Sequence, residues 1–230
     1  MESFTLIALP LFPLQSVLFP GGLLPLRIFE VRYLDMVRRC HEAGTPFGVV
    51  CLQQGSEVLR PPPATQPNPS GQPPAPSGDG FANETFFDIG TLARIDDLQR
   101  PQPGLIMIRC TGTQRFRVQR REKLRHGLWT ADVELLADDP VVAVPDDLAH
   151  TRTAFEHLIA RIEEQIPRPA ERPLLPPYRW DDCGWLANRW CELLPLEPGL
   201  KQRFMSLDNP LVRLELVADT LGQMGFKLPH

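Results

Sequence analysis

The sequence lacks the motifs by which most nucleotide-hydrolysing enzymes and serine hydrolases are recognised. No glycine stands directly before a lysine in the 230 residues, so there is no GxxxxGK[ST] phosphate loop. The motif GxGxxG is absent as well. The serine motifs GxSxG and SxxK are also missing. Ser206 follows Lys201 at short range, but we interpret this pair as part of a polar corner between helices. We therefore expect no catalytic residue and no cofactor, and we expect that the chain is not an enzyme.

Cysteine and histidine are too few and too scattered to indicate a disulfide framework or a metal centre. The 5 cysteines form no CxxC pair, and the 5 histidines are dispersed without an HExxH motif. An odd, small number of cysteines is typical of a reducing compartment, where they act as small buried hydrophobic residues. We expect a cytoplasmic protein without a metal site.

Lysine is scarce, and almost all of the positive charge comes from arginine. The formal net charge is -4, which does not favour general binding to nucleic acid or to an anionic membrane. Residues 3–26 carry no charge and could be mistaken for a membrane span. However, Pro10, Pro13, Pro20 and Pro25 interrupt this stretch, and each interior proline costs a helix about 3 kcal/mol. No basic region precedes it, which argues against a signal peptide. We expect short buried strands joined by turns.

The hydrophobic share of 43% is sufficient for a sizeable core, and the 26 prolines divide the chain. Apolar residues recur at helical spacing over 29–43, and Gly44 then ends the helix. A strand over 47–52 follows. From Pro61 to Gly78 there is no charge and no large apolar residue, so we expect a disordered insertion over 61–80. A docking site for a proline-recognising domain is the alternative there.

The hydrophobic period changes from about 2 to about 3.6 near residue 140. Residues 85–136 alternate like strands, and several short strands at such spacing indicate a sandwich or a small barrel. Helical spacing then marks 155–166, 186–194 and 214–224, with Asn209 and Pro210 forming a cap before the last helix. We predict an α+β protein with a β-rich subdomain over 1–140 and a helical bundle over 141–230.

Six basic residues lie between Arg115 and Arg125, with Glu122 as the only acid among them. On a barrel this stretch could contact phosphates, with Arg117, Arg120 and Arg121 as the contacting residues. No aromatic side chain alternates outward with these arginines to stack bases. A solvated strand and hairpin is the simpler interpretation, and an acidic protein partner is a third.

Long stretches of the chain resemble the N-terminal domain of Lon proteases. The opening LPLFPLQSVLFPGGLLPLRIFEVRYLDMVRRC, from Leu9 to Cys40, matches the proline-punctuated strands of that family and the segment that opens its first helix. Further similar segments are 89–95, the Gly-x-x-Arg-Phe-x-Val strand at 112–118, the strand at 129–135 and the C-terminal helices. The resemblance covers nearly the whole chain apart from the 61–78 insertion.

The resemblance implies a PUA-like pseudo-barrel followed by a helical bundle, and a role in recognising exposed or tagged protein segments. Full-length family members continue into an ATPase and a Ser–Lys protease domain, and we expect a stand-alone member without either. An apolar groove between barrel and helices could take an extended chain. Phe29, Arg32 and Tyr33 are the candidate binding residues, and the simpler interpretation is structural, with Phe29 and Tyr33 filling the seam between helix and barrel and Arg32 orienting the turn. A protease or chaperone is a further expected partner. The alternative function is RNA binding, because PUA-like barrels elsewhere bind RNA.

Overall fold

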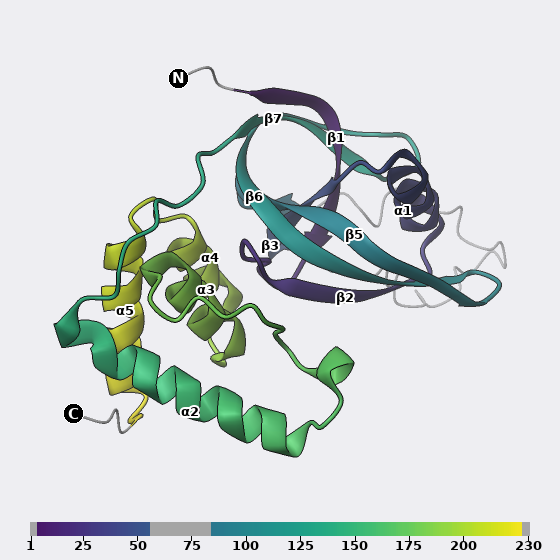
Figure 1. The fold of residues 1–230 in the computed structure, drawn as a ribbon. Helices are drawn as coiled ribbons and strands as arrows, with labels where there is room; N and C mark the ends of the chain where they lie inside the picture. Colours follow the sequence, from purple (N-terminus) through teal and green to yellow (C-terminus); the bar gives the residue numbers. More distant parts are fainter. Residues whose placement is uncertain (1–3, 56–83, 227–230) are drawn as a thin grey trace, which may run out of the picture.

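The computed structural model describes residues 4–55 and 84–226, so the predicted insertion over 61–80 lies outside the described residues. The element order confirms an α+β fold in which a sheet is followed by helices (Figure 1). Among the residues that the structure describes, all strands precede residue 136, and four of the five α-helices follow residue 148. The change of hydrophobic period near residue 140 therefore marks the passage from a barrel half to a helical half.

Five strands close into a ring, in the order β1, β7, β6, β5, β3 and back to β1. Only the β1–β3 pairing is parallel. β2 joins the outside of this ring through β6, and β4 joins it through β3. The strands are β1 (Thr5–Leu14), β2 (Leu23–Ile28), β3 (Phe47–Gln54), β4 (Thr85–Phe86), β5 (Ile89–Gln102), β6 (Leu105–Lys123) and β7 (Trp129–Leu135). Among the described residues, β2 lies outside this ring and pairs with β6 alone.

The interior of the barrel packs around Phe116, which is fully buried. A Cβ built on Gly48 would lie 2.8 Å from the Phe116 ring, and one on Gly90 would lie 2.5 Å from it. Real Cβ atoms do not approach so closely, so glycine at these two positions makes room for the ring. The alternation seen in the sequence thus produces a close-packed barrel.

Helix α1 (Val31–Ala43) covers the side of the barrel away from the other helices (Figure 1). Its buried face carries Tyr33, Met36, Val37 and Cys40, as helical spacing predicts. The helix begins two residues later than the predicted range and ends at Gly44, whose φ of 64° is the left-handed conformation typical of that position.

The helical half packs around Trp190, which is 1% exposed. Its elements are η1 (Asp146–Leu148), α2 (Ala149–Gln165), η2 (Pro169–Glu171), α3 (Cys183–Leu193), α4 (Pro198–Met205) and α5 (Pro210–Gln223). The predicted cap of α5 is confirmed, because the Asn209 side chain accepts hydrogen bonds from the backbone N–H groups of Leu211 and Val212. In the described ranges, no helix has the length and apolar character needed to cross a membrane.

Candidate functional site

A cavity of about 710 Å³ lies where the barrel half meets the helical half, and we call it the interdomain groove. Its size falls within the roughly 300–1,000 Å³ typical of ligand sites. Most of its lining is apolar. The barrel half contributes Gln15, Ser16, Val17, Leu18, Leu23, Leu24, Pro25 and Arg109. The helical half contributes Ala170, Glu171, Arg172, Pro173, Glu192, Leu193, Leu196, Pro198 and Lys201.

The groove runs along an edge of β2. Leu23, Leu24 and Pro25 are consecutive strand residues, and all three line the cavity. Since successive side chains of a strand point to opposite faces, a cavity that touches three in a row lies along the strand edge. The register pairs these residues with β6 on the other edge. Among the described strands none pairs with the other edge of β2, and the groove lies beside this strand and its β6 neighbour Arg109.

Arg189 of α3 pairs with Glu192, which lines the groove, and connects the helical half to the turn before β2. Its guanidinium donates to the carbonyl oxygens of Pro20, at 2.7 Å, and of Gly21, and it forms an ion pair with Glu192 at 3.0 Å. A Cβ built on Gly22 would lie 2.0 Å from Oε1 of Glu192, so only glycine lets this turn approach α3. The arrangement holds the turn between β1 and β2 against the helical half.

Burial perturbs the charges at this contact. Loss of water raises the pKa of Glu192 to about 7, although Arg189 and Lys201 lower it in part. Burial also lowers the pKa of Lys201, whose Nζ donates to the Glu192 carbonyl oxygen at 3.2 Å. Lys201 thus binds a carbonyl at the C-terminal end of α3, a favourable place for a cation.

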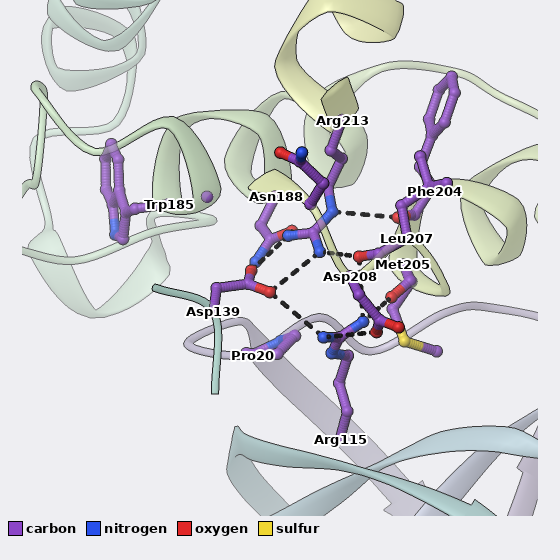
Figure 2. Close-up of polar contacts among 12 residues, drawn as sticks. Pro20, Arg115, Asp139, Trp185, Asn188, Phe204, Met205, Leu207, Asp208 and Arg213 are labelled. Carbon is purple, nitrogen blue, oxygen red and sulfur yellow. Dashed lines mark hydrogen bonds and ion pairs between the residues drawn. The ribbon is translucent and has the colours of Figure 1, made fainter. Parts of the chain in front are cut away.

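Two buried arginines join the halves at a second place (Figure 2). Arg115 of β6 donates to the carbonyl oxygens of Met205 and Leu207, at 3.0 and 3.1 Å. Arg213 of α5 donates to the carbonyl oxygens of Phe204 and Leu207. Asp139 lies between the two guanidinium groups and pairs with both, at 3.3 Å to Arg115. The carboxylate lets two like charges remain close together in a buried position.

A family profile described as ATP-dependent protease La (LON) substrate-binding domain matches residues 8–223, which is most of the chain. The chain belongs to this LON substrate-binding domain family. The matching profile is that of the substrate-binding part of Lon, and neither its ATPase nor its protease part is represented in the match.

Solved structures agree with this assignment. The Lon N-terminal domain protein from Xanthomonas campestris is 30% identical, with a TM-score of 0.65, and the match covers 93% of this chain and 98% of that one. The N-terminal domain of the Mycobacterium avium complex Lon protease is 12% identical, with a TM-score of 0.50, over 92% and 96% of the two chains. The second similarity concerns the fold alone.

The three residues proposed from the LON resemblance lie apart from the interdomain groove. Arg32 is buried, with Nη1 donating to the Gly127 carbonyl oxygen at 2.8 Å and Nε to Glu30 at 3.0 Å. Tyr33 is buried and stacks on Phe12, with ring centroids 4.0 Å apart. Phe29 is 54% exposed and borders a small cavity of about 80 Å³. Of the three, Phe29 is the side chain accessible to a partner, and a binding role for them remains a prediction.

The basic stretch of this LON domain is not a uniform stripe, because Arg115 points into the junction between the halves. Arg117, Arg120 and Arg121 are exposed on β6. In the β6–β7 register, Arg117 lies opposite Glu134, and Arg120 lies opposite Asp132. Acidic neighbours of this kind reduce the local positive potential. Contact with RNA stays a prediction that nothing in this geometry favours.

The other candidate chemistry does not converge on a site. The Ser206 hydroxyl donates to the Gln202 carbonyl oxygen at 2.7 Å, while Lys201 binds the Glu192 carbonyl, so the two are not a catalytic pair. All five cysteines are buried and free, and burial raises the pKa of the Cys110 and Cys191 thiols to about 12. No group of three metal-ligating side chains occurs within residues 4–55 and 84–226.

Sequence reasoning expected a groove between barrel and helices but could not locate it. Its walls come from residues 15–25, 109, 170–173 and 192–201, which are far apart in the sequence. No short motif joins these segments. The one available signal was the apolar, proline-punctuated run at residues 17–25, which is too hydrophobic for an ordinary surface turn.

Proposed function

We propose that this chain is a non-catalytic module that binds exposed, apolar protein segments in the interdomain groove. The observation that carries the proposal is a largely apolar groove lying along the uncovered edge of β2. An extended peptide could form backbone hydrogen bonds with such an edge while its side chains enter apolar pockets. Membership of a family whose description is substrate binding supports the same role.

The partners proposed are unfolded or tagged protein segments, with a separate protease or chaperone receiving them. The groove offers apolar contact and backbone hydrogen bonds, and neither requires a particular residue order in the partner. The catalytic role is proposed to lie elsewhere, because the serine, lysine and cysteine side chains described above form no nucleophile–base pair. We expect the purified protein to hydrolyse neither ATP nor peptide.

Substitution of Leu23 tests the groove. Leu23 lines the groove and is half-buried, so Leu23→Gln should remove apolar contact with a bound peptide. Burying a leucine contributes about 1.5–3 kcal/mol. A partial loss of this contribution should weaken binding roughly 5- to 30-fold. The measurement is fluorescence anisotropy with a short, labelled, apolar peptide.

The matched control is Leu216→Gln on α5, where the leucine is 39% exposed and does not line the groove. This control should leave the affinity unchanged. Equal loss in the two variants, or no loss in either while binding persists, would place the peptide elsewhere on the surface.

A further inference from the structure

The interdomain groove has charged side chains at its margins as well as apolar walls, and its two carboxylates are already paired. Glu192 forms an ion pair with Arg189 at 3.0 Å. Glu171 forms an ion pair with Arg168, also at 3.0 Å. The Glu192 charge is thus paired in a mostly buried position, whereas the pair of Glu171 with Arg168 is exposed to solvent.

The cations of the groove are compensated less completely. Arg172 pairs with Glu163 of α2 at 3.0 Å. Neither Arg109 nor Lys201 has a carboxylate within ion-pair distance among the residues that the structure describes. The groove thus combines an apolar lining with two cations that form no ion pair among the described residues, although the Glu192 carboxylate favours the charged form of Lys201.

Arg109 belongs to the barrel wall. It lies on β6, opposite Pro25 of β2 in one register and opposite Asp97 of β5 in the other. The Asp97 carboxylate accepts a hydrogen bond from Gln99 Nε2 at 2.9 Å. Arg109 therefore borders the strand along which we place the peptide.

Lys201 belongs to the opposite wall. It lies on α4, and its Nζ donates to a backbone carbonyl of α3, which leaves the other two N–H groups of the ammonium without a described partner. The two cations consequently come from the two halves of the molecule, and both line the groove.

We infer that the interdomain groove selects extended apolar segments flanked by aspartate or glutamate side chains, which Arg109 and Lys201 contact. The inference rests on the proposed function and adds a charge preference to it. Cations beside a partly dehydrated groove attract acidic flanks and repel basic ones, so charge here contributes specificity more than overall affinity. An extended segment that runs past both cations can place an acidic side chain beside each of them. A terminal carboxylate lies at one end of a peptide and could contact only one.

Three peptides test the preference. They share one apolar core, have acetylated N-termini and amidated C-termini, and differ only in flanking residues, which are glutamate, glutamine or lysine. We expect the glutamate peptide to bind about 5- to 10-fold more tightly than the glutamine peptide at low salt. The lysine peptide should bind most weakly. The difference should shrink as salt is raised, because exposed charges are screened.

The variant that carries both Arg109→Gln and Lys201→Gln should lose the preference for glutamate. It should bind the glutamine peptide within about twofold of the unaltered protein, which shows that the apolar groove is intact. Arg109→Gln alone should reduce the preference for glutamate. Because this single variant keeps Lys201, it tests the preference even if the loss of Lys201 destabilises the fold. Arg120→Gln, at an exposed arginine outside the groove, is the control and should leave the preference unchanged.

The outcomes separate the inference from the proposed function. If the three peptides bind equally, or if the lysine peptide binds best, the charge preference is wrong while groove binding stands. If the capped glutamate peptide does not bind but a peptide with a free C-terminal carboxylate does, the groove recognises a chain terminus and not an acidic side chain. If none of the peptides binds with or without caps, the proposed function itself fails.

Discussion

Glu192 lies in the junction between α3 and the turn before β2. Its ion pair with Arg189 does not fully compensate for the removal of water from the carboxylate. Its side chain is 19% exposed, and burial raises its pKa from 4.5 to about 7. An unfolded chain would ionise this group near pH 4.5. Between those two values the folded state binds more protons than the unfolded state, so the contribution of Glu192 to stability falls as pH rises from about 4.5 to about 7.

Glu192→Gln should remove this pH dependence. The amide keeps an acceptor for Arg189 but carries no charge to desolvate, so we expect the variant to be more stable than the parent by about 1 kcal/mol at pH 8. At pH 4 the two proteins should be nearly equal. Chemical denaturation at both pH values measures the difference. A variant less stable than the parent at pH 8 would show that the ion pair outweighs the cost of burial.

At the scale of elements, the N-terminal cap of α5 is a local feature with a local energetic effect. Asn209 accepts from two backbone N–H groups at 3.0 and 3.3 Å, and Pro210 occupies the first turn. Asn209→Ala should therefore lower the free energy of unfolding by about 1 kcal/mol. Asn209→Gly should cost only a few tenths of a kcal/mol. A thermal or denaturant transition measures both, and equal losses would assign the effect to something other than the cap.

Elements were predictable from the sequence where one face of them is buried. Periodicity identified α1, α2, α3 and α5, and alternation identified the strands that close the barrel. It did not show that the apolar run at 105–110 and the Arg115–Val118 segment belong to a single strand, β6. A strand that changes partners along its length, from β2 to β7, changes which residues it buries, so its pattern is not uniform.

The site was less predictable than the fold for a related reason. Arg115 and Arg117 look alike in the sequence, yet Arg115 is buried in the junction and Arg117 is exposed. Arg115 and Arg117 lie on the same face of β6, so the difference depends on how far along the strand the helical half packs, and this is not visible in a local pattern. The groove depends on the same long-range contacts.

At the scale of the whole molecule, the barrel and the bundle are coupled through buried polar groups. Arg115 and Arg189 each reach across the junction to backbone carbonyls of the other half. Gln202 of α4 likewise donates to the Ile89 carbonyl oxygen at 2.8 Å. Because these groups would be left without partners if the halves separated, we expect both halves to unfold together.

Arg115→Met tests this coupling. The variant loses two hydrogen bonds to the turn after α4 and the contact with Asp139, so the free energy of unfolding should fall by about 2–4 kcal/mol. Three of the four tryptophans lie in the helical half, so fluorescence reports that half while circular dichroism reports the whole chain. In the unaltered protein the two transitions should coincide.

The control for this coupling is Arg117→Met, two positions along the same strand. Its side chain is exposed, so the change should stay within about 0.5 kcal/mol. Transitions that already differ in the unaltered protein would mean that the halves are independent, and equal stability of the two variants would mean that Arg115 does not hold them together.

Pro25 limits what the uncovered edge of β2 can do. The β2–β6 register continues without a shift across Pro25, so the position without an N–H group falls on the outer edge. Under the proposed function, a guest strand that pairs with this edge would lack the hydrogen bond at Pro25, which limits how far a regular ladder can extend. We therefore expect that this edge of β2 does not act as a template for fibre growth.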